Sequence, residues 1–204
     1  MLNKDVSFIQ ELWKKLTRNG QIKAIFAGGC LRDTLLERPV KDYDLFIEYD
    51  DWYNAMVVLS QEFPGNIGLK HCTNEAMGAY GSGEARIAEV DSRLLLGDYI
   101  VDFIRLPENY PLDKVVEEFD TGISKVSFDG KLRITPEFYK DVAEKTITVY
   151  RVNGTGDRLV NRLSRLEEKY PEFRVGAGNR VADMELPSTY RKPAEEDIYS
   201  NIGF

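Results

Sequence analysis

The chain has 204 residues, of which 43% are hydrophobic and 11% aromatic, and it carries a formal net charge of −7. This composition is ordinary for a globular protein with one substantial core or two small ones, and the acidic balance argues against broad electrostatic affinity for nucleic acid. No apolar stretch approaches the roughly 20 residues of a membrane-spanning helix, so we expect no such span.

The cysteines and the histidine narrow the chemistry further. Cys30 and Cys72 form neither a metal-ligand spacing nor a disulfide framework, which fits a reducing compartment. The one histidine, His71, cannot by itself hold zinc. The first residues, Met-Leu-Asn-Lys-Asp, resemble neither a secretory nor an organelle-targeting segment. We therefore expect a cytoplasmic protein that has no membrane partner.

The first predicted elements are a helix, a strand and a second helix. Apolar residues recur at helical spacing over 4–18, a strand is predicted over 22–27, and the second helix covers 30–37. Gly28 and Gly29 lie between the strand and this helix. Because glycines have no side chain, backbone N–H groups there can approach an anion at the positive end of the helix. The sequence predicts a phosphate cradle at this turn, where Cys30 would also be accessible to thiol reagents.

Two aspartates stand at the head of a strand predicted over 43–49. A strand places alternate side chains on one face, so Asp42 and Asp44 should point the same way, with Cα atoms roughly 6 to 7 Å apart. Two carboxylates held in this way make a hard-oxygen site suited to Mg²⁺. The metal site and the phosphate cradle should therefore lie next to each other.

The two patterns occur together in one ordered string. From Gly28 the chain reads Gly-Gly-x-x-Arg-Asp-x-Leu-Leu-x-Arg, and Asp-x-Asp-Leu follows at 42–45. This combination resembles the signature of the bacterial-type poly(A) polymerases and tRNA CCA-adding nucleotidyltransferases, which belong to the DNA polymerase β superfamily. The resemblance implies an α+β fold, with a polymerase β-like nucleotidyltransferase head, a mixed sheet flanked by helices, and a small neck-like segment after it.

The resemblance also implies roles for the residues of the glycine turn. Gly28 and Gly29 would line the triphosphate of a bound nucleotide, and Arg32 would supply positive charge beside it. Asp33 would belong to the same nucleotide-binding turn or simply orient the loop. The alternative for Arg32 and Asp33 is an ordinary exposed pair on the first helical turn.

The elements that follow are a helix, a loop and a hairpin. The helix is predicted over 51–63, and the Gly-rich stretch 65–85 reads as a mobile loop that could lie over the site. Strands predicted over 86–96 and 99–106 are joined by a turn at Gly97-Asp98.

The family's chemistry uses two divalent ions and a third carboxylate to bridge them. The resemblance implies that Asp42 and Asp44 are metal ligands and catalytic residues, and Asp102 in the second hairpin strand is the best candidate for the third. Glu89 and Asp91 on the preceding strand are the competitors. An acid in such an apolar run would be costly to bury unpaired, so the alternative for Asp102 is a salt bridge to a neighbouring basic residue.

A further helix over 111–118 leads into the segment 119–124, and a hairpin turning at Asp129-Gly130 follows. In the family, an Arg-Asp-Phe-Thr-Ile-Asn-Ala type motif at a comparable place is tied to the ribose and the domain junction. Asp120 or Thr121 would discriminate the ribose by this comparison. The match is degraded, because Gly122 interrupts the pattern.

After a helix over 136–144 and a strand over 146–152, the chain resembles the family's neck helix. Leucines fall on one side of this helix and basic residues opposite, which indicates either a solvated face or a basic groove. In the family, an acid and an arginine at Glu-Asp-x-x-Arg spacing hydrogen-bond the incoming base. Asp157, Arg158 and Arg162 are the candidates, although the acid is displaced relative to the arginines.

These expectations divide the chain into three parts. A catalytic domain covers 1–118, a neck-like segment 119–175, and a loosely packed tail 176–204. Relative to the family, the chain looks truncated, without the C-terminal RNA-binding domains. Self-association into a homo-oligomer could supply the missing surface.

The predicted function is a Mg²⁺-dependent nucleotidyltransferase that uses two ions and moves a nucleoside monophosphate from a nucleoside triphosphate to an acceptor hydroxyl. The resemblance favours a tRNA-like RNA 3′ end as the acceptor. Transfer to a protein or a small molecule, or a catalytically silent nucleotide-binding protein, are the alternatives.

Overall fold

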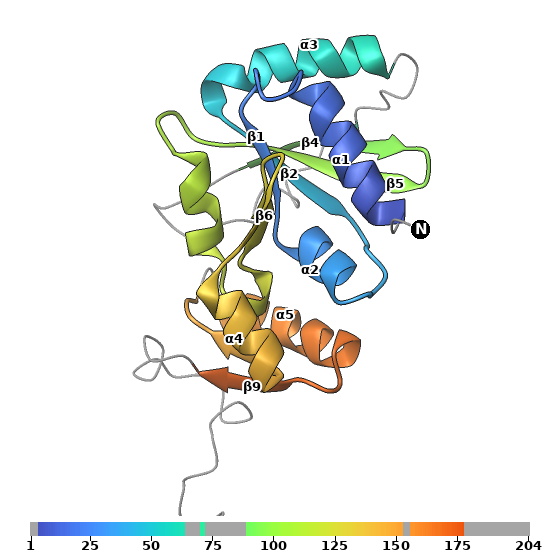
Figure 1. The fold of residues 1–204 in the computed structure, drawn as a ribbon. Coiled ribbons are helices and arrows are strands. Elements are labelled where there is room, and N and C mark those ends of the chain that lie inside the picture. Colours follow the sequence, from blue (N-terminus) through green and yellow to red (C-terminus); the bar gives the residue numbers. More distant parts are fainter. Residues whose placement is uncertain (1–3, 64–69, 72–88, 153–155, 178–204) are drawn as a thin grey trace, which may run out of the picture.

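The computed structural model describes residues 4–63, 70–71, 89–152 and 156–177 (Figure 1). A mixed sheet of seven strands, in the order β3-β4-β5-β2-β1-β6-β7, forms its largest part. The β2–β5 pair is parallel, and the other neighbours are antiparallel. The strands are β1 Ala24–Ala27, β2 Tyr43–Ile47, β3 Lys70–His71, β4 Glu89–Leu96, β5 Tyr99–Arg105, β6 Val126–Phe128 and β7 Leu132–Ile134. The predicted α+β class with a mixed sheet is confirmed.

Three α-helices cover one face of this sheet, and their bounds lie close to those predicted. They are α1 Lys4–Leu16, α2 Gly29–Leu35 and α3 Trp52–Glu62, and a short 3-10 helix, η1 Tyr49–Asp51, precedes α3. Their apolar sides bury against alternate residues of the central strands, such as Phe26, Leu45 and Phe103. No helix in the described ranges has both the length and the apolar character needed to cross a bilayer.

The opposite face of the sheet has its own smaller core. The 3-10 helix η2, Leu112–Glu118, occupies the position predicted for a helix over 111–118. Its Val115 packs with Ile25, Phe46 and Ile104, which are the alternate residues of β1, β2 and β5. Because side chains alternate along a strand, Asp44 and Asp102 belong to this second face, two residues before Phe46 and Ile104.

A second unit packs below the head in Figure 1. Its elements are the 3-10 helix η3 Gly122–Ser124, α4 Pro136–Glu144, β8 Thr146–Val149, α5 Gly156–Lys169 and β9 Arg174–Ala177. β8 and β9 pair in parallel. The leucines predicted to face inward on the last helix, Leu159, Leu163 and Leu166, are buried in the core of this unit together with Tyr170.

The two units are interleaved along the chain. The hairpin of β6 and β7, which turns at Asp129 and Gly130 as predicted, joins the edge of the large sheet beside β1. The head sheet therefore extends beyond residue 118, where the catalytic domain was expected to end. The predicted loop over 65–85 falls largely outside the described residues, and so does the tail beyond 177.

Gly122, which interrupts the family pattern, is required by close packing. A β-carbon at this position would lie 2.7 Å from Asp141 Oδ2 and 2.8 Å from Tyr150 Cε2. Asp141 is fully buried, and its Oδ2 accepts a hydrogen bond of 3.0 Å from the Thr148 backbone N–H. The carboxylate thus ties α4 to β8, and only a residue without a side chain leaves room for it.

We expect Gly122→Ala to lower the free energy of unfolding by about 1–3 kcal/mol, because the added methyl group overpacks a site that is already filled. Urea denaturation followed by circular dichroism measures the change. Gly176→Ala is the matched control in the same unit, since a β-carbon there meets nothing within 4 Å. Equal stability of the two variants would contradict the crowding at Gly122.

Candidate active site

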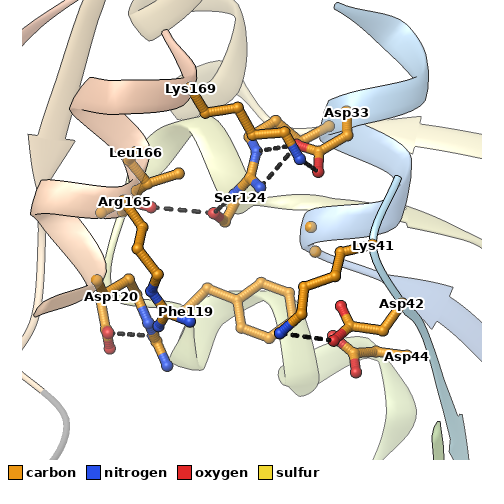
Figure 2. A pocket seen from close by; sticks show the side chains of 15 residues that line it. Asp33, Lys41, Asp42, Asp44, Phe119, Asp120, Ser124, Arg165, Leu166 and Lys169 are labelled. Atoms are coloured by element: carbon orange, nitrogen blue, oxygen red, sulfur yellow. Dashed lines mark hydrogen bonds and ion pairs between the residues drawn. The ribbon is translucent and has the colours of Figure 1, made fainter. Parts of the chain in front are cut away.

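A pocket of about 300 Å³ lies where the head meets the second unit. It is lined from the glycine turn, the start of β2, the segment around η3 and the helix α5 (Figure 2). The lining residues that bear on its chemistry are Gly28, Gly29, Arg32, Asp33, Lys41, Asp42, Asp44, Phe119, Asp120, Thr121, Ser124, Arg162, Arg165 and Lys169. Segments far apart in the sequence therefore converge on one cavity.

The glycine turn is shaped by Gly28. This residue has φ 79° and ψ −129°, a conformation that residues with a side chain rarely adopt, and a β-carbon would lie 3.3 Å from Phe119 Cζ. Its N–H donates to the Val126 carbonyl at 3.0 Å, which joins the turn to β6. A β-carbon on Gly29 would make only an ordinary contact of 3.5 Å with Arg32 Nη2. The backbone conformation therefore favours glycine at position 28, and the contact with Phe119 adds to this preference, whereas neither applies at position 29.

Asp42 and Asp44 both line this pocket. Asp44 is the second residue of β2, and Asp42 immediately precedes the strand. The two side chains turn the same way in Figure 2, and Lys41 Nζ lies 3.7 Å from Asp42 Oδ2. The paired acids and the glycine turn are thus brought together as the sequence predicts, while their roles in metal binding and catalysis stay predictions.

Asp102 is arranged differently. It is the register partner of Asp44 across the parallel β2–β5 pair, but it does not line the pocket. Asp102 is buried, with 4% of the residue exposed, and its carboxylate accepts two hydrogen bonds from Arg93, at 2.5 Å from Nε and 2.6 Å from Nη2. The salt bridge raised as the alternative for Asp102 is therefore present.

Three acids do not converge on one point in the described part of the chain, so the predicted third metal ligand is not assembled with Asp42 and Asp44. The side chains of the competing candidates, Glu89 and Asp91, lie outside the described residues.

Arg32 and Asp33 form a buried network, and the alternative of an exposed pair is wrong. Arg32 Nε donates to Asp33 Oδ1 at 2.7 Å and to the Tyr170 hydroxyl at 3.1 Å, and its Nη1 donates to Ser124 Oγ at 3.0 Å. The Tyr170 hydroxyl and the Lys169 ammonium both donate to Asp33. The first turn of α2 is thereby bonded to the end of α5.

The network fixes the charge states of its members. Burial alone would lower the pKa of the Arg32 guanidinium, but the Asp33 carboxylate and the Tyr170 oxygen raise it above its ordinary value. Burial is also the main reason that the pKa of Tyr170 is raised, and Asp33 adds to the effect. Arg32 is therefore a permanent cation at the pocket wall, and Tyr170 remains a neutral hydrogen-bond donor.

Of the predicted ribose and base residues, the pocket includes three. Asp120 and Thr121 are buried at its wall, and Arg162 reaches it from α5 and forms an ion pair with Asp120. Arg158 is exposed and does not line the pocket. The side chain of Asp157 lies outside the described residues.

Sequence reasoning missed several residues of this pocket. Arg165 and Lys169 were noted as basic residues of the last helix but were not assigned to the site, and Lys41 was not considered. The signal was present in the helix, because positions 162, 165 and 169 recur at helical spacing on one face. Nothing in the sequence pattern indicates which side of that face meets the glycine turn.

The pocket lining combines four carboxylates with five cationic side chains. Asp33 and Asp120 form ion pairs with residues of α2 or α5, and Asp42 forms one with Lys41. Asp42 and Asp44 lie on the side of the pocket formed by β2. Such a cavity offers hard oxygen ligands on one wall and positive charge on the other, which suits a polyanion that binds together with a divalent cation.

Cys30 is not accessible in the phosphate turn, contrary to the sequence expectation. Its side chain, on the first turn of α2, is buried in the core of the head, and Sγ contacts the Ala27 carbonyl oxygen at 3.7 Å. Burial raises the pKa of the Cys30 thiol far above its ordinary value, and the nearby Asp44 carboxylate raises it further.

We expect Cys30 to resist thiol reagents in the native protein, because it is both buried and protonated at pH 8. In a Cys72→Ser variant, which leaves Cys30 as the remaining thiol, a colorimetric disulfide reagent should react with less than about a tenth of the chains before denaturant is added. Full reaction should follow in guanidinium chloride. Rapid labelling of the folded variant would show that the thiol faces the pocket.

We expect Asp33→Asn to lower the free energy of unfolding by about 3 kcal/mol, because Arg32 and Lys169 lose the carboxylate that neutralises them. Glu172→Gln is the control, since it breaks the half-exposed ion pair of Arg38 with Glu172 and should cost less than about 1 kcal/mol. Chemical denaturation of both variants gives the comparison. A similar cost for the two would mean that the Asp33 network does not stabilise the junction.

No protein-family model and no curated protein matches the sequence. The fold, however, is similar to solved structures of tRNA nucleotidyltransferases. The Thermotoga maritima CCA-adding enzyme complexed with tRNA has a TM-score of 0.58 and 18% identity, over 85% of this chain and 40% of that chain. A CCA-adding enzyme in complex with CTP has a TM-score of 0.58 and 18% identity, over 85% and 39%.

A tRNA nucleotidyltransferase complexed with a primer tRNA and an incoming ATP analog has a TM-score of 0.53 and 16% identity, over 80% of this chain and 46% of that chain. The chain thus spans less than half the length of these solved proteins. At this level of identity the similarity establishes the fold: the protein has the nucleotidyltransferase head fold of the CCA-adding enzymes.

Proposed function

We propose that this protein is a nucleotidyltransferase that transfers a nucleoside monophosphate from a nucleoside triphosphate to an acceptor hydroxyl. One observation carries the proposal: a single pocket, in this fold, holds the glycine turn, the paired acids Asp42 and Asp44, and the basic face of α5. Each of these features is common alone. Together they supply the three things that phosphoryl chemistry on a triphosphate needs, namely a metal site, an anion cradle and charge neutralisation.

Asp42 and Asp44 fit a divalent cation by their chemistry. Mg²⁺ is bound through one or two carboxylates together with substrate phosphates, and two carboxylates line this pocket. These residues would hold the metal. When bound, the metal would lower the pKa of the acceptor hydroxyl and neutralise charge on the phosphate oxygens.

The remaining residues of the pocket would bind and orient the triphosphate. Gly29 is the first residue of α2, so its N–H can approach a phosphate, whereas the N–H of Gly28 is already bonded to the Val126 carbonyl. Lys41 and Arg165 reach the pocket from exposed positions, and their side chains can reorient toward an incoming anion. Arg32 adds a fixed positive charge, because its donors are committed to Asp33, Ser124 and Tyr170.

The reaction is a substitution at the α-phosphorus. The acceptor oxygen forms a bond to this phosphorus, the bond from the phosphorus to the pyrophosphate oxygen breaks, and the hydroxyl proton leaves to solvent. Ribose contacts are proposed for Asp120 and Thr121, and a base contact for Arg162, because all three line the pocket. Asp120 lies on the side opposite Asp42 and Asp44 in Figure 2. Of the two neck candidates whose side chains are described, Arg162 lines the pocket and Arg158 does not.

The acceptor proposed here is an RNA 3′ end. Two structural neighbours are described as complexes with tRNA or with a primer tRNA, which favours an RNA acceptor over a protein or a small molecule. Neighbours are also described with CTP and with ATP, which favours a ribonucleoside triphosphate as the donor.

We expect Asp42→Asn combined with Asp44→Asn to reduce nucleotidyl transfer at least about 100-fold, because the metal loses both carboxylates. The measurement is transfer of label from each of the four α-labelled ribonucleoside triphosphates, with Mg²⁺, to separate pools of tRNA and of protein. Asp98→Asn is the control: this acid is exposed on the β4–β5 turn, outside the pocket, and its loss should leave the rate unchanged.

If label appears on polypeptide and not on RNA, the proposed RNA acceptor is wrong, but the proposed nucleotidyl transfer stands. If transfer by the wild-type protein is absent with every acceptor, or if it survives the double substitution, the proposed activity is wrong.

A further inference from the structure

We propose that Arg93 is a built-in counter-ion that competes with divalent metal for Asp102, so that Asp102 does not join Asp42 and Asp44 in the metal site at rest. The inference rests on the proposed function, because it concerns the same metal site. It differs from the expected arrangement, in which three carboxylates share the metal.

The competition follows from the register of the sheet. Asp44 and Asp102 are Cα partners on β2 and β5, and Asp102 and Arg93 are Cα partners on β5 and β4. The three residues therefore form one row across the second face of the sheet, with Asp102 in the middle. A cation held by Asp44 and the guanidinium of Arg93 approach the same carboxylate from opposite sides.

In the absence of metal, the Asp102 carboxylate is bound by Arg93. Its Nε and Nη2 bind both oxygens of Asp102, which is the bidentate geometry that gives the strongest ion pairs. The Asp102 side chain is 6% exposed, so the pair has little competition from water on the acid's side. Asp102 does not line the pocket.

The ion pair can nevertheless be broken by movement of Arg93. The side chain of Arg93 is 44% exposed, so the guanidinium can rotate into solvent without burying a charge elsewhere. A metal ion that bound between Asp44 and Asp102 would have to displace Arg93, and the free energy of this displacement would reduce its net binding free energy. Metal binding to Asp102 should therefore be weakened by Arg93 and strengthened by its removal.

The test is a titration of the full chain with Mn²⁺ alone, in which free Mn²⁺ is followed by its electron paramagnetic resonance signal. The wild-type protein is compared with Arg93→Gln, Asp102→Asn, the double variant of these two, and Asp42→Asn combined with Asp44→Asn. Lys131→Gln, an exposed cation on the β6–β7 turn, controls for the change in net charge.

We expect Asp102→Asn to change the Mn²⁺ affinity of the wild-type protein by less than about twofold, because Arg93 already withholds this carboxylate. Arg93→Gln should raise the affinity for Mn²⁺ by about tenfold or more, or it should allow a second Mn²⁺ ion to bind. The gain should vanish in the double variant and should be absent in Lys131→Gln.

A loss of about tenfold in Asp102→Asn alone would overturn the inference, because Asp102 would then be a ligand in the presence of Arg93. So would a gain in Arg93→Gln that persists in the double variant. Should Arg93→Gln fail to fold, Arg93→Lys should give an intermediate gain, because it keeps the charge but loses the bidentate geometry. The absence of any gain in Arg93→Lys would then count against the inference. If the wild-type protein binds no Mn²⁺ that depends on Asp42 and Asp44, the metal site of the proposed function fails instead.

Discussion

The carboxylate of Asp33 holds the two units of this molecule together. It accepts hydrogen bonds from Arg32, Lys169 and the Tyr170 hydroxyl, so that one buried acid joins the first turn of α2 to the last turn of α5 and the residue after it. Two cations neutralise the acid, and the acid in turn allows two cations to lie side by side at low exposure. The pocket exists because this junction fixes the basic face of α5 opposite the glycine turn.

The same junction separates the charges of the pocket into two kinds. Charges that belong to ion pairs, such as those of Arg32, Asp33 and Asp120, are part of the wall and keep their state. The side chains of Lys41 and Arg165 are exposed, so their charges can reorient toward a bound ligand. A triphosphate that enters such a site meets a preorganised field and a few adaptable contacts, which is the arrangement that lowers the cost of reorganisation during phosphoryl transfer.

The fold and the start of the site could be predicted from particular residues. Periodicity places the helices and most of the strands, because a single apolar face determines each element. Asp42 and Asp44 could be paired from their spacing at the head of a strand, and the Gly28 turn from the helix that follows. The partners of Arg32, Asp33 and Asp102 could not be predicted. Tyr170 reaches Arg32 and Asp33 through the packing of α5, and Arg93 reaches Asp102 through strand register, and both depend on contacts between distant segments.

By itself, the sequence determined which local elements form and which chemical groups stand at their ends, because helical and strand periodicity act over a few residues. It determined that glycine and aspartate occur where a strand meets a helix and where the next strand begins. The tertiary structure alone decided which acids face the pocket and which are neutralised. Asp44 and Asp102 are neighbours in one sheet, yet Arg93 on the adjoining strand pairs with the second carboxylate, since the state of a buried acid is governed by the residue across from it.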